Sequence, residues 1–176
     1  MSVSEKLLES VTPLMVYKCS FEKTGINYNV FLSTDDISTA AKEMLRKEYY
    51  LEDIDALDVS EGFLITYHYA RFDSPERVAH RVMLTHDEPV VPTISDVYQG
   101  ANWHERECAD FHGINFSGHP NLIPLLLDPD TPQGVLLKDV KSRMPLRDLI
   151  NPGESIFTTE GFTLFDEVQA EPEEPK

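Results

Sequence analysis

Several residue types are scarce in this chain of 176 residues, and each scarcity excludes a class of protein. The two cysteines, Cys19 and Cys108, lie far apart and form no C-x-x-C pair, so the chain alone cannot assemble an iron–sulfur cluster, a zinc knuckle or a disulfide framework. None of the eight glycines falls in a G-x-G-x-x-G or Walker pattern, which argues against nucleotide binding.

Cationic side chains are also few, with 15 lysines and arginines against 31 acidic residues and a formal net charge of -16. Because such a surface repels phosphates, we expect no binding to nucleic acid or to anionic membranes. No apolar stretch approaches the roughly 20 residues of a membrane span. Residues 1–10 lack the basic-then-apolar pattern of a signal peptide, so we expect a cytoplasmic location.

The pattern of apolar residues predicts an α+β domain. Residues 15–21 and 26–32 alternate between apolar and polar or small side chains, as strands do. Residues 37–45 follow a helical repeat behind Ser33 or Thr34 as the N-cap. Three further strand-like runs lie at residues 51–59, 63–71 and 78–85. This order favours a mostly antiparallel sheet with helices on one face.

Beyond these strands the expected elements are two helices. We predict a short helix over residues 93–99, and then a highly charged helix that Asn102 caps and Gly113 ends. Residues 1–116, with the charged helix included, are therefore assigned to the α+β domain.

Residues 117–176 are expected to form an extended, proline-rich docking segment and an acidic tail. The prolines are too dense for regular helices or central strands, and they stand at positions 120, 124, 129, 132, 145 and 152. Acidic residues dominate from Glu160 onward, a composition that favours disorder. Large apolar residues nevertheless occur near the tail, and we expect them to dock on this domain or on another chain: Phe157, Phe162, Leu164 and Phe165.

The charged helix, from Trp103 to Gly113, is the most unusual part of the chain. At about 100° per residue, Glu107, Asp110 and Ile114 lie within roughly 40° of Trp103, so two carboxylates share the side of the largest apolar group. Burial of unpaired carboxylates is costly, so they should meet a cation or a partner.

A metal- or thiol-dependent hydrolase is one interpretation of this helix. His104, Cys108 and His112 recur at i, i+4 and i+8, but eight residues rise about 12 Å, so only two of them could share one metal ion. His119, beyond Gly113, is the candidate third ligand beside His104 and Cys108. A thiol in the middle of a helix lacks an oxyanion hole, which disfavours nucleophilic catalysis.

Recognition is the other interpretation. Arg106 and Asp110 can pair at i, i+4, whereas Glu105 and Glu107 lack obvious cations nearby. Their partners could be arginines of the sheet, namely Arg71, Arg77 or Arg81, or they could belong to a second protein. Apolar residues beside the charges would suit the centre of an interface: Trp103, Phe111, Ile114 and Phe116. A self-contained acidic binding module is a further alternative.

The same residues resemble a known family, that of the thirty-kilodalton subunit (the C subunit) of respiratory NADH:quinone oxidoreductase, complex I, which membrane-bound nickel–iron hydrogenases share. The similar residues lie between positions 103 and 122: Trp103, Glu105, Arg106, Glu107, Asp110, Phe111, Gly113, Ile114, Phe116, Gly118, His119, Pro120 and Leu122. The resemblance covers approximately residues 7–139.

Some positions depart from the family pattern. His112 stands where the family usually has an apolar residue, and Ile123 and Pro124 stand where respiratory members tend to carry arginines. Residues 134–139 keep only part of the family's Pro-Leu-Arg-Lys-Asp ending. The run 124–127 is more similar to the hydrogenase branch, so the resemblance leaves the choice between the two branches open.

The resemblance implies a non-catalytic assembly subunit that binds no cofactor or metal itself. Such a subunit packs against the large, hydrogenase-like subunit and a cluster-bearing small subunit, on the cytoplasmic side of the membrane. Iron–sulfur clusters and other redox groups are expected in those partners. The residues expected at the partner interface are Trp103, Glu105, Arg106, Glu107, Asp110, Phe111, Gly113, Phe116, Gly118, His119 and Pro120.

Overall fold

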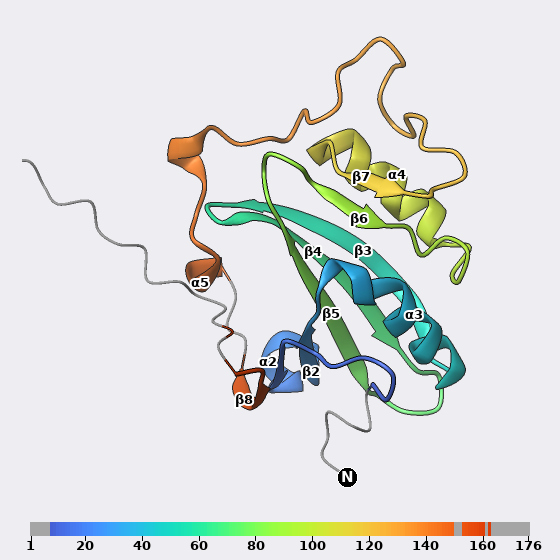
Figure 1. Ribbon diagram of the computed structural model, residues 1–176, viewed down its shortest axis with the longest axis vertical. Coiled ribbons are helices and arrows are strands. Elements are labelled where there is room, and N and C mark those ends of the chain that lie inside the picture. The colour runs from blue at the N-terminus through green and yellow to red at the C-terminus, as the bar shows by residue number, and fades with distance from the viewer. Residues whose placement is uncertain (1–7, 150–152, 161, 163–176) are drawn as a thin grey trace, which may run out of the picture.

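A six-stranded sheet organises the fold in the computed structural model, which describes residues 8–149, 153–160 and 162 (Figure 1). Its strand order is β3-β4-β5-β2-β1-β8, and only the β2–β5 pairing among these neighbours is parallel. The strands are β1 (Met15–Lys18), β2 (Tyr28–Phe31), β3 (Tyr50–Val59), β4 (Gly62–Ala70), β5 (Arg77–Leu84) and β8 (Glu154–Thr158). The predicted α+β class with a mostly antiparallel sheet is confirmed.

The remaining elements are short, apart from two helices. A second sheet pairs β6 (Val90–Pro92) with β7 (Asn115–Ser117) in parallel. The helical elements are α2 (Phe21–Thr24), η1 (Thr34–Asp36), α3 (Ile37–Arg46), α4 (Ala101–His112), η2 (Val140–Ser142) and α5 (Leu146–Leu149).

Helix α3 forms where the apolar repeat predicts it. Ile37, Ala40, Ala41 and Met44 are buried in the main core, which explains the i, i+3, i+4, i+7 spacing. The predicted N-cap is wrong, because Asp36 holds the N-cap position of α3. Ser33 instead precedes the 3-10 turn η1, and its hydroxyl donates to the Asp36 carboxylate at 2.7 Å.

Apolar side chains occupy both faces of the sheet because successive strand residues point in opposite directions. One face packs against α3 and α4 and holds the larger core. On the other face a smaller cluster includes Leu64 of β4 and Phe31 of β2, and it is completed by Leu146 of α5 and by Phe162. The C-terminal segment therefore covers part of the second face.

The predicted helix over residues 93–99 is wrong. This stretch is a turn in which the N–H groups of Val97 and Tyr98 both donate to the Ile94 carbonyl at 2.9 Å. Directly after this turn the Ala101 N–H donates to the Tyr98 carbonyl at 2.9 Å, and α4 begins at Ala101.

The sequence prediction is wrong for the start of α4 and is confirmed for its end. Asn102 is not the N-cap, since Gly100 holds that position and α4 begins one residue before Asn102. Gly113 does end the helix, with φ 69° and its N–H donating to Ala109 O. A left-handed conformation of this kind favours glycine at the C′ position.

Part of the predicted docking segment returns to the α+β domain. β8 pairs antiparallel with β1, so residues from both sides of the predicted boundary at 116 share one sheet. Phe157 packs against the larger core and Phe162 against the smaller cluster, which docks both on their own domain. Leu164, Phe165 and the acidic residues 163–176 lie outside the described residues.

Candidate functional site: the charged helix and the segment it holds

Glu105 faces the core from the first half of α4 and has no exposed surface. Its Oε1 accepts the Ile94 N–H at 2.8 Å, and its Oε2 accepts the Thr93 hydroxyl. Burial raises the pKa of Glu105 to about 7, although both hydrogen bonds act in the opposite direction. The carboxyl group therefore fixes the turn between β6 and α4.

His119 follows β7, after Gly113 has ended α4, and its side chain lies against Glu105. Its Nε2 is 3.9 Å from Glu105 Oε2 and donates to the Asn102 carbonyl at 3.3 Å, while its Nδ1 accepts the Asn121 N–H at 3.1 Å. These two bonds define a neutral tautomer, and burial lowers the pKa of His119 in agreement with it. His119 therefore closes the loop after β7 onto α4.

Asp110, in the second half of the helix, also has no exposed surface. Its Oδ2 accepts the backbone N–H groups of Leu125 and Leu126 at 2.8 Å and that of Leu127 at 3.3 Å. The Asp110 carbonyl accepts the Gly134 N–H at 2.8 Å. Backbone donors, rather than a cation, thus bind Oδ2, whereas Oδ1 is buried and has no hydrogen-bond partner among the described residues.

Arg106 does not pair with Asp110, contrary to the i, i+4 prediction. Its Nε donates to the Ile123 carbonyl and its Nη2 to the Pro124 carbonyl, both at 2.9 Å. The guanidinium also lies 6.0 Å from the centre of the Trp103 ring. Arg106 and Asp110 therefore hold carbonyl and N–H groups of the same short stretch of chain.

The predicted shared side of the helix is divided in the structure. Trp103 is 63% exposed and Glu107 is exposed, whereas Asp110 and Ile114 are buried. The reason is that residues 122–137 contact α4 at Arg106, Asp110 and Phe111 and leave Trp103 and Glu107 exposed.

The arginines of the sheet do not supply the partners either. Arg71 binds Asp73, Arg77 binds Glu52, and Arg81 binds the side chains of Asn29 and Thr66. Glu105, Arg106 and Asp110 find partners within the chain, but most of these are backbone groups that no charge pattern reveals, and Asp110 Oδ1 has none among the described residues.

The hydrolase alternative gains no support from the geometry. The Cys108 thiol is buried, donates to the Ile54 carbonyl at 3.6 Å, and has a pKa raised by burial and by nearby carboxylates such as Asp55. His104 Nδ1 instead lies 3.0 Å from Asp53 Oδ1. Within residues 8–149, 153–160 and 162, no three His, Cys, Asp or Glu side chains are grouped to hold a metal ion.

The remaining residues of the family resemblance lie at β7, in the chain that follows it, or at the end of α4. Phe116 is buried in the core as the central residue of β7, and Gly118 turns the chain with φ 81°. The Phe111 carbonyl accepts the Leu136 N–H at 2.9 Å, while Pro120 is exposed.

Asp58 is a second buried carboxylate that binds the segment after β7, and no sequence pattern reveals it. This buried side chain of β3 accepts the Lys138 N–H at 2.8 Å and contacts His86 Nε2 and Arg143 Nε, each at 2.9 Å. Burial alone would raise its pKa, but the Lys138 N–H, His86 and Arg143 hold the pKa of Asp58 below its usual value. Asp110 and Asp58 hold separate points of residues 122–146, which we call the strap; Figure 1 shows it changing from amber to orange as it runs past α4 to α5.

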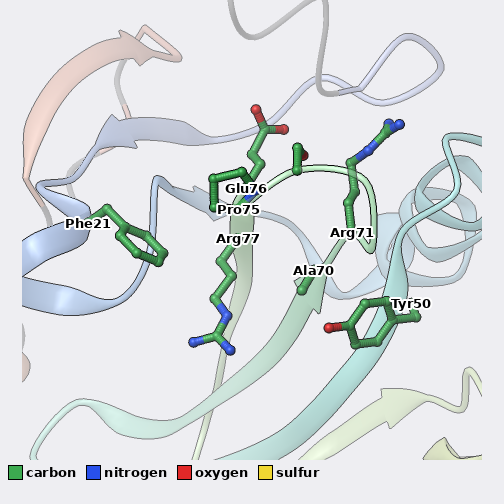
Figure 2. Close-up of a pocket in the computed structure, with 8 residues that line it drawn as sticks. Phe21, Tyr50, Ala70, Arg71, Pro75, Glu76 and Arg77 are labelled. Carbon is green, nitrogen blue, oxygen red and sulfur yellow. The ribbon is translucent and has the colours of Figure 1, made fainter.

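A hollow of about 260 Å³ lies at the end of the sheet where β4 and β5 connect. Figure 2 shows the Arg77 side chain between Phe21 and Tyr50, with Ala70 between Arg77 and Tyr50. Arg77 is paired with Glu52 at 2.9 Å, so its charge is already compensated. The hollow involves none of the signature residues and does not define a catalytic site.

Comparison with known proteins places this architecture in a family. Residues 30–146, more than half of the chain, match the family model described as respiratory-chain NADH dehydrogenase, 30 Kd subunit, and the chain belongs to this family. The similar residues over positions 103–122 fall inside the match, as do α3, β3, β4 and β5, whereas β1 and β8 lie outside it.

Two relatives illustrate the extent of the similarity. The NADH-quinone oxidoreductase C subunit of Roseiflexus castenholzii is 37% identical over 87 residues, which cover 49% of this chain and 50% of the relative. The NADH-quinone oxidoreductase C/D subunit of Methylococcus capsulatus is 32% identical over 136 residues, covering 77% of this chain and 20% of the relative. The chain thus spans half or less of the length of these relatives.

A solved structure shows the same fold. A chain of the membrane-bound sulfane sulfur reductase, an archaeal respiratory membrane complex, superposes with a TM-score of 0.55 at 24% identity, covering 58% of this chain and 64% of that one. Among the described residues, no helix is both long enough and apolar enough to cross a membrane.

Proposed function

We propose that this chain is a non-catalytic assembly subunit of a membrane-attached oxidoreductase, either an NADH:quinone oxidoreductase of the complex I type or a related membrane-bound hydrogenase. It packs against the large, hydrogenase-like subunit and a cluster-bearing small subunit on the cytoplasmic face. It carries no cofactor, and the redox groups reside in the partners.

One observation carries the proposal: Glu105 and Asp110 of α4 act inside the chain, and large apolar side chains remain exposed on and beside this helix. Glu105 and Asp110 are fully buried and hold backbone N–H groups, so neither is available to a substrate. Trp103, Ile123 and Leu126 are exposed around the Arg106 anchor. Tryptophan and arginine are enriched among the residues that dominate binding energy at interfaces.

The relatives support the choice of partner. The name of the Methylococcus protein joins a C part and a D part, and this chain matches only a fifth of its length. A polypeptide that carries both parts keeps them close together, which favours the large subunit as the neighbour.

Co-purification tests the proposal. The full chain, expressed together with the large subunit of its own complex, should be recovered with it, and the replacement Trp103→Ala should weaken that recovery by about tenfold or more. Because Trp103 is 63% exposed, the variant should melt at nearly the wild-type temperature.

The matched control is Phe72→Ala, which removes an 89% exposed aromatic side chain beyond the far end of β4. This variant should bind as the wild type does. Failure of the wild-type chain to associate with the large subunit, or a substrate turnover by the isolated chain, would contradict the proposal.

A further inference from the structure

Three polar rings lie side by side in the larger core. Tyr67 and Tyr69 of β4 point to the same face of the sheet, because they are two residues apart. His80 of β5 is the register partner of Tyr67, and its ring centre lies 4.9 Å from that of Tyr69. We call these three side chains the polar core patch, which lies on the face of the sheet that packs against α3 and α4.

The polar core patch is completely buried, and its polar atoms lack partners. None of the three side chains has any exposed surface. The Tyr67 and Tyr69 hydroxyls and both ring nitrogens of His80 make no hydrogen bond within the part of the chain that the structure describes. Buried polar side chains in folded proteins are nearly always hydrogen-bonded, to protein or to ordered water, because an unmet donor or acceptor is costly. These atoms therefore need partners that the described residues do not supply.

The neighbouring polar side chains have hydrogen-bond partners of their own. The Tyr98 ring centre lies 5.7 Å from that of Tyr69, but the Tyr98 hydroxyl donates to the Tyr49 carbonyl at 2.8 Å. Glu105 lies near Tyr67, whose pKa is raised well above its usual value by burial and then by the Glu105 charge. Both Glu105 carboxylate oxygens, however, accept hydrogen bonds from the turn before α4. Neither Tyr98 nor Glu105 hydrogen-bonds to the polar core patch.

The patch offers donors and acceptors together. Each tyrosine hydroxyl can donate and accept, and burial lowers the pKa of His80 to about 3, so its neutral ring has one donor and one acceptor nitrogen. An anion would need donors alone, and a cation would need acceptors alone. A water molecule both donates and accepts, and buried waters typically make about three hydrogen bonds to polar groups that lack other partners. Water is therefore the ligand whose chemistry fits the patch.

We propose that the polar core patch is an internal water site, in which ordered water bridges the His80 ring to the hydroxyls of Tyr67 and Tyr69. Water held in this way is part of the fold, because it joins β4 to β5 on the face that α4 covers and supplies the hydrogen bonds that the three side chains lack. The site is separate from the strap and from the surface around Trp103.

Removal of single hydroxyls tests the site through the sign of the effect on stability. Tyr67→Phe and Tyr69→Phe should each lower the melting temperature of the full chain by roughly 2–4 °C, because each takes a hydrogen-bond partner from the bound water. A dry patch predicts the opposite sign, since each replacement would remove a buried hydroxyl that has no partner. A melting temperature that is unchanged or raised in both variants would overturn the proposal.

The matched control is Tyr98→Phe. This variant loses a direct hydrogen bond to the Tyr49 carbonyl, so its melting temperature should fall whether or not the patch holds water. Its decrease sets the scale for one buried tyrosine hydroxyl in this core, and the decreases of Tyr67→Phe and Tyr69→Phe should be of similar size.

A crystal structure of the full chain, at a resolution that shows ordered water, tests the site directly. Water should lie within about 3.2 Å of at least two of the four polar atoms of the patch. It should be lost or displaced in Tyr67→Phe and should remain in Tyr98→Phe. A patch without water in the wild-type crystal would overturn the proposal. Both measurements use the chain alone, so their results do not depend on the proposed partner.

Discussion

Asp110 Oδ2 lies 2.8 Å from the backbone nitrogen of Leu126, and this bond ties the charged helix to the strap. The carboxylate also accepts the N–H groups of Leu125 and Leu127, so one buried charge orders three consecutive residues. Hydrogen bonds to an ionised group are stronger than neutral ones. A helix rich in acidic residues can thus fix another segment of its own chain.

Asp110→Ala should weaken the attachment of the strap to α4. The loss of three charge-assisted bonds should cost roughly 2–4 kcal/mol of unfolding free energy, measured by chemical denaturation. The amides of residues 125–127 should then exchange with solvent faster. Asp110→Asn, which keeps an acceptor without the charge, should fall between the wild type and Asp110→Ala, and equal stability of all three would contradict this role.

Glu105 should make stability fall as the pH rises through neutrality. Its pKa is raised by burial from 4.5 to about 7, so its favourable contribution is complete below pH 4.5 and is lost as the pH passes about 7. Glu105→Gln removes this loss and should therefore gain stability relative to the wild type by roughly 2–4 kcal/mol above pH 8. Denaturation curves from pH 4 to 9 measure the difference, and a difference that does not vary with pH would refute the assignment.

His80 should make stability fall as the pH drops below neutrality, which is the opposite of the effect of Glu105. Burial lowers its pKa from 6.5 to about 3, and neither ring nitrogen has a hydrogen-bond partner among the described residues. The unfolded chain therefore binds a proton that the folded chain excludes, and stability falls as the pH drops from 6.5 towards 3. His80→Leu should flatten this decline, which the same denaturation series would detect. A decline as steep as that of the wild type would show that His80 is not its source.

Cys108 should be chemically inert in the native chain. Its thiol is buried and its pKa is raised, so the reactive thiolate is scarce at neutral pH. Alkylation of Cys108 should be at least about a hundredfold slower in the native protein than in denaturant, followed by mass spectrometry of the labelled peptide. Cys108→Ser should keep the fold and should not change the metal content. Rapid native labelling would reopen the thiol-enzyme alternative.

Much of the fold follows from local patterns in the sequence. The strands β3, β4 and β5 are apolar-rich runs of strand length, the helix α3 repeats its apolar residues at a period of 3.6, and Gly113 carries the left-handed end of α4. The strand β8 escaped prediction because its five residues pair with β1, which lies far away in the sequence. A short strand of this kind has no periodicity to detect.

The candidate site was predicted only in part, for a similar reason. The sequence marks Glu105, Arg106 and Asp110 as unusual, but their partners are backbone N–H and carbonyl groups, which every residue has. Asp58 looks like an ordinary strand acid until Lys138 approaches from 80 positions away. Side-chain patterns therefore predict which groups need partners, and only the tertiary structure shows what those partners are.

Hydrogen exchange of the full chain, alone and with the large subunit of its complex, tests the central claim most directly. We predict that the amides of Leu125 and Leu126 are protected in the free chain, because Asp110 holds them, and that protection increases around Trp103 when the large subunit binds. Rapid exchange of Leu125 and Leu126 in the free chain, or exchange around Trp103 that binding leaves unchanged, would contradict that claim.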